Sequence, residues 1–147
     1  MASPGQNKKW VVYGALNFTT GQIVHDIRRT KSGVGFYDLV VRLVERARRK
    51  GRKIILVCDG PQFHKTKKIL AYLPTVARHL EIFWLPAYSP DLNLIERLWG
   101  HMKRRHIANV LYSSQFELYR AVARILSELN QRRGSALDVV FRKRKAA

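Results

Sequence analysis

Residues 82–105, IFWLPAYSPDLNLIERLWGHMKRR, combine an apolar strand pattern, a loop bounded by prolines and a helix that opens with a carboxylate. The apolar run at 81–85 predicts a short buried strand. The apolar residues of the helix recur at the spacing of one buried face: Ile95, Leu98, Trp99 and Met102. Glu96 lies at the edge of that face, and a basic run follows at 103–105. One carboxylate and several cations therefore come directly after a strand.

A second carboxylate, Asp59, follows another apolar run, KIILVC at residues 53–58. The continuous apolar centre of that run predicts a strand covered on both faces, as in a parallel sheet. Ligands of such sheets collect at the carboxyl ends of parallel strands. We therefore expect Asp59 and the loop that leads to Glu96 to meet at one edge of a sheet.

The preceding residues predict a hairpin and then a helix. Residues 9–18 and 23–27 are typical strands, and Gly21 in the turn between them can adopt a positive φ. From residue 35 the apolar period changes to that of an amphipathic helix, which Gly51 ends. The expected buried face of this helix comprises Phe36, Leu39, Val40, Leu43, Val44 and Ala47.

Two further helices complete the pattern. A basic helix is expected at about 64–78, with a buried face of Ile69, Leu70, Leu73, Val76 and Ala77. Ser113 or Ser114 is the expected N-cap of a last helix, and Glu117 completes a capping box with Ser114. The expected buried face of that helix comprises Phe116, Tyr119, Val122, Leu126 and Leu129.

The element order is therefore β-β-α-β-α-β-α-α, which indicates an α/β fold with a mixed sheet and flanking helices. We expect a disordered N-terminus at 1–8, one domain at 9–134 and a basic C-terminal tail at 135–147. A chain of 147 residues is long enough for one proper core.

The charge balance points to a polyanionic partner. Twenty-eight Lys and Arg face ten Asp and Glu, a formal net charge of +18. Nucleic acid is the obvious partner for such an excess, although a ribosomal-type protein or a general binder of acidic surfaces has the same balance. The single cysteine, Cys58, excludes an internal disulfide and cysteine-based zinc motifs. With no membrane span or secretory signal in the pattern, we expect a cytoplasmic protein, nucleoid-associated if bacterial.

Both carboxylates have a structural and a functional interpretation. Asp59 can be a turn former before Gly60, and Glu96 can form a capping box with Asn93 as the structural cap of its helix. Alternatively, both carboxylates bind a metal. Mg²⁺ takes hard oxygen ligands, and a pair of ions roughly 3.5–4 Å apart can assist phosphodiester chemistry. Such a site needs three or four acidic ligands, of which two are visible.

The cations near the two carboxylates fit a nucleic-acid path. Because these cations are not balanced by acids at i,i+4 spacing, we favour contacts with phosphates over a solvated helix face. The expected nucleic-acid-binding residues are His64, Lys65, Lys67 and Lys68 after Asp59, and Arg97, Lys103, Arg104 and Arg105 after Glu96.

These blocks resemble a known family. The stretch ILVCDGPQFHKT resembles the second catalytic block of the mariner-like transposases and their bacterial insertion-sequence relatives, and LPAYSPDLNLIERLWGHMKR resembles their third block. Two positions differ from the family pattern, Gly60 where Asn is usual and Leu94 where Pro is usual. The resemblance covers nearly the whole chain, from about Trp10 to the C-terminal helix.

The resemblance implies an RNase H-like fold and a DDE (Asp-Asp-Glu) metal site for Mg²⁺ or Mn²⁺. By motif position, Asp59 corresponds to the second acid and Glu96 to the third, with 36 residues between them. The family's first Asp lies on a central strand that precedes the hairpin, so we expect the chain to be the C-terminal catalytic portion, without that strand and without the N-terminal DNA-binding domains. A two-metal site would need a third carboxylate from elsewhere.

Two hypotheses follow. The first is a DDE transposase portion that acts on transposon ends and target DNA in cut-and-paste transposition, truncated or encoded in a split frame, with weak or no activity alone. Its expected partners are DNA and either an upstream transposase fragment or a second copy of the chain. The alternative is a non-enzymatic, basic DNA-binding remnant of the same fold.

Overall fold

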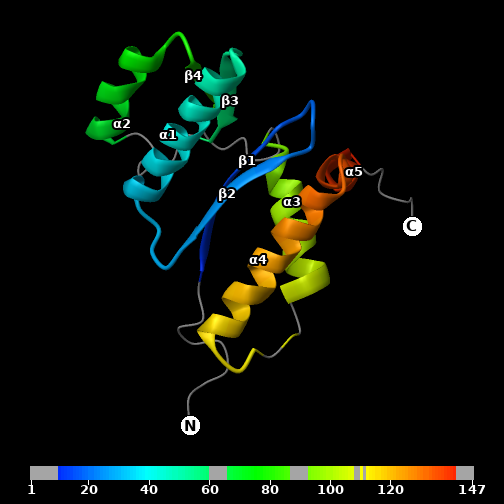
Figure 1. Cartoon of the computed structure of the whole chain (residues 1–147). Coiled ribbons are helices and arrows are strands. Elements are labelled where there is room, and N and C mark those ends of the chain that lie inside the picture. The colour runs from blue at the N-terminus through cyan, green and yellow to red at the C-terminus, as the bar shows by residue number, and fades with distance from the viewer. Residues whose placement is uncertain (1–9, 60–65, 87–92, 108–109, 111, 142–147) are drawn as a thin grey trace. The chain divides into compact units, whose positions relative to one another are not determined.

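The computed structural model describes residues 10–59, 66–86, 93–107, 110 and 112–141. The chain divides into two compact units (Figure 1): unit 1 comprises Met1–Arg29 and Leu94–Ala147, and unit 2 comprises Thr30–Asn93. Each unit has its own strands and helices and is described by itself.

Unit 1 begins with the predicted hairpin. Strands β1 (Val11–Leu16) and β2 (Ile23–Arg28) pair antiparallel, with Leu16 opposite Ile23. Gly21 has a φ of 76°, as the turn requires, and its backbone N–H donates to the Asn17 carbonyl at 2.8 Å. The hairpin prediction is confirmed.

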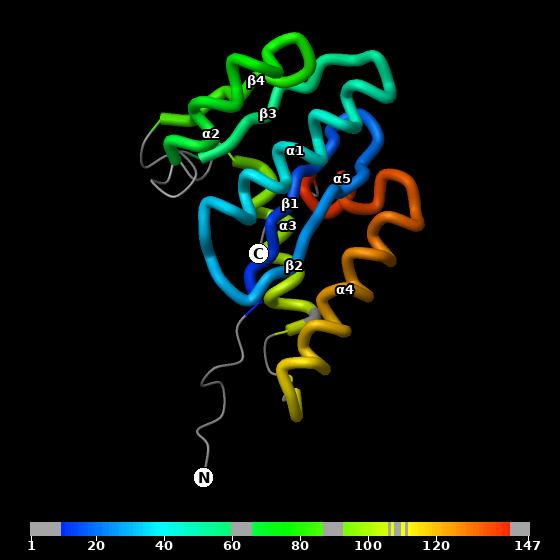
Figure 2. Tube along the Cα trace, turned by 60° about the vertical axis from the view of Figure 1, so that its left-hand side comes forward, coloured from blue at the N-terminus to red at the C-terminus, as the bar shows by residue number. Residues whose placement is uncertain are grey.

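The helices of unit 1 are α3 (Ile95–Met102), a π-helical segment that continues it (Lys103–Ile107), α4 (Gln115–Gln131) and α5 (Ser135–Phe141). Figure 2 shows α4 running alongside the β1–β2 hairpin. One apolar cluster joins these helices to β2, made of Ile23, Leu98, Met102, Leu118, Val122, Ile125, Leu126, Ala136 and Val140.

The C-terminal segment of unit 1 differs from the prediction. Residues 135–147 were expected to be a basic tail, but Ser135–Phe141 forms α5, and Ala136 and Val140 are buried. The mostly apolar segment SALDVVF at 135–141 precedes the basic residues, and burial of Ala136 and Val140 stabilises the helix. Residues 142–147 lie outside the described residues.

Unit 2 begins with α1 (Gly33–Lys50), and its sequence pattern predicted its packing. Every residue of the expected face is buried: Phe36, Leu39, Val40, Leu43, Val44 and Ala47. Gly51 ends the helix in the left-handed conformation with a φ of 63°. These predictions are confirmed.

Strands β3 (Ile54–Cys58) and β4 (Leu80–Trp84) form a parallel pair in unit 2, with Ile54 opposite Leu80 and Cys58 opposite Trp84. The Phe36 ring of α1 lies 6.2 Å from the Trp84 ring. The opposite face is open, since 56% of Ile55 and 59% of Phe83 are exposed. The prediction that β3 is covered on both faces is therefore wrong for the described residues.

The helix expected at 64–78 is shorter and in two parts. Helix α2 covers Lys67–Tyr72, and a 3₁₀ turn follows at Leu73–Val76. The cause is Pro74, which has no backbone N–H to continue an α-helix. Only two of the five residues expected on the buried face are buried, Ile69 and Val76.

The described strands form two separate two-stranded sheets, β1–β2 and β3–β4. The mixed α/β class is confirmed, and the predicted element order is observed with α5 added. The single mixed sheet of the prediction is not seen among the described strands. No helix in the described part of the chain has the length and apolar content needed to cross a bilayer.

Candidate metal and nucleic-acid site

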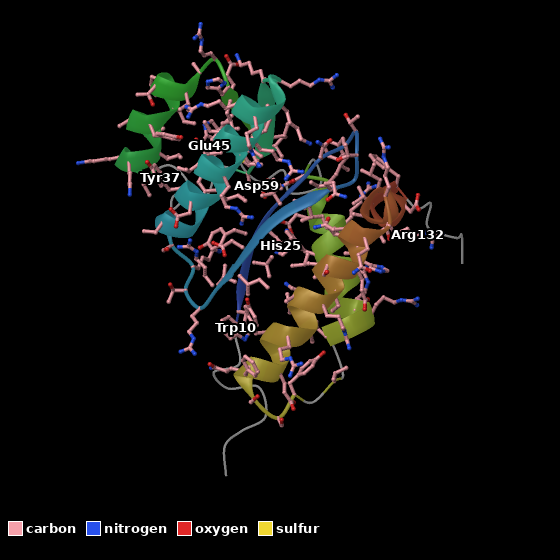
Figure 3. All side chains as sticks on the ribbon, viewed as in Figure 1. Trp10, His25, Tyr37, Glu45, Asp59 and Arg132 are labelled. Carbon is pink, nitrogen blue, oxygen red and sulfur yellow. The ribbon has the colours of Figure 1, made fainter. Side chains whose placement is uncertain are left out.

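Asp59 follows directly on the last residue of β3. The backbone N–H of Leu85 donates to the Cys58 carbonyl at 2.9 Å, so β3 and β4 stay paired up to the position of Asp59. Because the two strands are parallel, their carboxyl ends lie at the same edge. Asp59 is half-buried there (Figure 3), held on a rigid strand end.

Asn93 lies close to Asp59, although 34 positions separate them in the sequence. The side-chain amide nitrogen of Asn93 donates to Oδ2 of Asp59 at 3.2 Å. Asn93 was predicted to be the N-cap of α3, and this is wrong: the N-cap is Leu94, with no side-chain cap hydrogen bond. The Asn93 amide instead donates to a carboxylate, a stronger kind of hydrogen bond than one between neutral groups.

Glu96 lies in the first turn of α3 and is exposed. Leu98 and Met102 are buried and fix which side of α3 faces the core. A carboxylate near a helix N-terminus is electrostatically favourable. Glu96 belongs to unit 1 and Asp59 to unit 2, so the pairing of these two carboxylates at one metal stays a prediction.

The chemistry of the donors suits a hard divalent cation. Asp59 and Glu96 offer carboxylate oxygens, which Mg²⁺ and Mn²⁺ prefer. Among the described residues, no group of three or more His, Cys, Asp or Glu is placed to hold a metal ion. The hairpin acid Asp26 accepts from Arg28 Nε at 2.8 Å in an ion pair.

The cations expected to contact nucleic acid after Asp59 are placed in part. Lys67 and Lys68 are exposed in the first turn of α2, which Thr66 caps by accepting from the Ile69 N–H. The Lys68 ammonium also lies 4.2 Å from the centre of the Tyr37 ring, a cation–π contact. His64 and Lys65 lie outside the described residues.

The cations expected after Glu96 lie on α3 and the π-helical segment. Lys103, Arg104 and Arg105 are exposed, and π-helical turns are frequent at functional sites. Arg97 has a structural role besides, because its guanidinium donates to the Val140 carbonyl in α5 at 3.2 Å.

Comparison with known proteins identifies the family. Residues 1–119 match the family model described as DDE superfamily endonuclease. The chain belongs to the DDE endonuclease superfamily. The predicted family is thereby confirmed.

Two relatives of this DDE chain are mobile-element proteins. An insertion element IS630 uncharacterized 39 kDa protein of Shigella sonnei is 28% identical over 130 residues, which cover 88% of this chain and 37% of that protein. The transposable element Tcb2 transposase of Caenorhabditis briggsae is 36% identical over 64 residues, which cover 44% of this chain and 22% of that protein. The chain thus spans little more than a third of the length of the IS630 protein. No solved structure gives a significant match.

Sequence reasoning missed one feature of the DDE chain's candidate site. The contact of Asn93 with Asp59 was not predicted, although Asn93 stands in the block that carries Glu96. The available signal was an amide side chain three residues before Glu96, and local capping offered an easier explanation.

Proposed function

We propose that the chain is the C-terminal catalytic portion of a DDE transposase, with the RNase H-like fold of that family, and that it acts on DNA at transposon ends. The single observation that carries the proposal is the bond between the Asn93 amide and Oδ2 of Asp59 at 3.2 Å. It ties the acid at the end of β3 to the residue two positions before α3, the helix of Glu96.

Asp59 and Glu96 are the residues that would hold Mg²⁺ or Mn²⁺, and a third carboxylate would complete a two-metal site. Bound metal supplies activation of the attacking oxygen and stabilisation of the leaving one. The chain's own residues position these groups: β3 fixes the backbone of Asp59, and Asn93 orients its carboxylate.

The exposed cations supply DNA binding. In the sequence, Lys67 follows Asp59, and the basic run 103–105 follows Glu96. The whole chain has a net charge of +18. Contacts of Lys and Arg with phosphates release counterions, so the affinity for DNA falls steeply with added salt. Both transposon-end and target DNA are expected ligands.

The edge of β3 that faces away from β4 is called here the outer edge, and its backbone groups are suited to binding a further strand. The Ile54 N–H donates to the His79 carbonyl and the Leu85 N–H to the Cys58 carbonyl, both at 2.9 Å. With the parallel register, these bonds direct the peptide groups of Ile54, Leu56 and Cys58 toward β4. Those of Ile55 and Val57 therefore point to the outer edge.

A further strand can pair with this outer edge, from an upstream transposase fragment or from a longer form of the protein. Exposed strand edges are templates for such pairing. Without such a partner strand, the chain alone is expected to show little or no strand transfer.

The proposed activity is tested by mixing the purified chain with transposon-end duplex and Mg²⁺ or Mn²⁺, with and without the part of the Shigella sonnei IS630 protein that this chain does not match. We expect strand cleavage only in the mixture and only with metal. Asp59→Asn and Glu96→Gln should each abolish it, whereas Glu128→Gln, a matched change of an exposed carboxylate on α4, should not. Cleavage that survives both substitutions would refute the assignment.

The alternative, a DNA-binding module without catalysis, is favoured by the large cationic excess. It predicts salt-sensitive retention of DNA that metal does not change and that Asp59→Asn leaves intact. Complete absence of cleavage in the mixture, together with such retention, would select this alternative.

The partner strand has its own test, amide hydrogen exchange in the isolated chain. The N–H groups of Leu56 and Cys58 should exchange slowly because they pair with β4, whereas those of Ile55 and Val57 should exchange quickly. Addition of the complementary IS630 fragment should slow the Ile55 and Val57 amides selectively. Equal exchange of all four amides in both samples would exclude pairing at this edge.

A further inference from the structure

The most concentrated charge of unit 2 lies where α1 ends and β3 begins. Residues 46–53, RARRKGRK, are called the basic segment, and six of the eight are cations: Arg46, Arg48, Arg49, Lys50, Arg52 and Lys53. All of these are exposed except Arg46, which is half-buried. None of them belongs to the cations expected near Asp59 or Glu96.

The backbone under the basic segment is fixed. Ala47 is buried and anchors the last turn of α1. Its carbonyl accepts from the N–H of Gly51 and from that of Arg52, the latter at 3.2 Å. The chain then enters β3, whose Ile54 N–H donates to the His79 carbonyl. The cations therefore project from a rigid turn between two regular elements.

Few acids offset this charge. Arg48 donates to Glu45 at 3.1 Å and Lys53 to Glu81 at 2.6 Å, both exposed pairs (Figure 3 shows Glu45 on α1). Four positive charges remain after these two pairs. A helix C-terminus favours cations in its last turn, which accounts for Arg48, Arg49 and Lys50 but not for Arg46 and Arg52.

The side chains of the basic segment favour one class of ligand. Insertion into a membrane surface requires exposed apolar side chains beside the charges, and the segment's only apolar side chain, Ala47, is buried. Binding of single strands relies on aromatic side chains that stack on bases, and the segment has none. Arg and Lys alone on a rigid support suit the phosphates of duplex DNA.

The basic segment is separate from the candidate metal site. It joins the first residue of β3, whereas Asp59 follows the last. At ~3.3 Å per residue, the five residues of β3 hold the two ends about 17 Å apart. We propose that the basic segment is a second binding surface for the sugar-phosphate backbone of duplex DNA, which contacts phosphates other than those at the Asp59 end.

The test is the salt dependence of binding to a 30-base-pair duplex of random sequence, measured by fluorescence anisotropy with the full chain. The slope of log affinity against log salt is negative, and each lost phosphate contact lowers its magnitude by ~0.9. The triple variant Arg49→Gln, Lys50→Gln and Arg52→Gln should lower the magnitude of that slope by about 2 to 3.

A matched variant separates position from net charge. Arg124→Gln, Arg132→Gln and Arg133→Gln remove the same number of charges from exposed positions, Arg124 in the middle of α4 and the other two just after its end. This variant should lower the magnitude of the slope by less than ~1. The charge-preserving variant Arg49→Lys with Arg52→Lys should keep the wild-type slope, and circular dichroism checks that each variant is folded.

The inference rests on the DNA binding of the proposed function, and the two can fail separately. A steep slope in the wild-type chain with equal losses in the two triple variants would overturn the inference and leave the proposed function standing. The inference would also be overturned if the triple variant of Arg49, Lys50 and Arg52 bound the duplex as the wild-type chain does and lost affinity only for a single-stranded oligonucleotide, or only for vesicles of equal phosphatidylserine and phosphatidylcholine. A wild-type chain that binds no duplex would overturn both.

Discussion

The side chain of Asn130 joins α4 to the hairpin of unit 1 as a strand partner would. Its amide nitrogen donates to the Ile23 carbonyl at 2.9 Å, and its Oδ1 accepts from the Ile23 N–H at 2.8 Å. Gln22 adds a bond from its side-chain amide to the Asn130 carbonyl at 3.1 Å. Asn130→Ala removes the first two bonds and leaves both peptide groups of Ile23 without this partner.

The cost follows from the burial of these groups. Each hydrogen bond contributes ~0.5–1.5 kcal/mol net, and an orphaned buried group costs ~1–3 kcal/mol. Both bonds are only part-buried, so water satisfies some of the lost bonding. Alanine regains ~0.5 kcal/mol of helix propensity. We therefore expect Asn130→Ala to lower the free energy of unfolding of unit 1 by about 2 kcal/mol.

Urea denaturation followed by tryptophan fluorescence measures this effect. Trp10 and Trp99 belong to unit 1 and Trp84 to unit 2, so a Trp84→Phe background isolates the signal of unit 1. The control is Gln131→Ala, the exposed neighbour on the same helix, which should change the free energy by less than ~0.5 kcal/mol. Equal effects of the two substitutions would show that the paired bonds to Ile23 do not stabilise the hairpin.

Three more substitutions test local features. In Gly14→Ala, the new Cβ would lie 2.7 Å from the Trp99 ring, so unfolding should become easier by ~1–3 kcal/mol, and by less in a Trp99→Phe background if the clash is the cause. Ser114→Ala removes the acceptor that caps α4 and should cost ~1 kcal/mol in urea denaturation, whereas Ser127→Ala, exposed within the helix, should be nearly neutral. Burial raises the pKa of the Tyr72 hydroxyl above 10.0. The neutral hydroxyl therefore contributes fully to stability below about pH 10, and this contribution is lost as the pH rises through the raised pKa. Tyr72→Phe should reduce the loss of stability at alkaline pH, and the same pH profile in the variant and the wild-type chain would contradict this prediction.

Helix α1 shows what the sequence could predict. Its 18 residues carry a regular apolar period, and the expected face is the buried face. Gly51 could be identified as its end because the left-handed conformation there, with a φ of 63°, favours glycine. In a long periodic helix with a local stop signal, the sequence alone predicts the buried face and the end of the helix.

Helix α4 shows what periodicity leaves open. Its sequence holds two overlapping apolar stripes, and the structure buries the one with Leu118, Val122 and Ile125. Phe116 is 65% exposed, and Tyr119 packs its ring 5.1 Å from the Trp10 ring instead. The choice depends on packing against α5 and against the hairpin, which is distant in sequence. For the same reason, the partner of Asn93 could not be predicted from local capping rules.

The most informative wrong prediction concerns the two faces of strand β3. Its apolar run predicted cover on both faces, yet 56% of Ile55 and 41% of Val57 are exposed in the described structure. Full burial of such a side chain contributes ~1.5–3 kcal/mol, so cover on that face would stabilise unit 2 appreciably. The same two residues direct their peptide groups to the outer edge. Side-chain pattern and backbone direction thus agree that β3 is suited to a position inside a larger sheet, and a strand that pairs there would also lie beside Asp59, where the proposed metal site needs its third carboxylate.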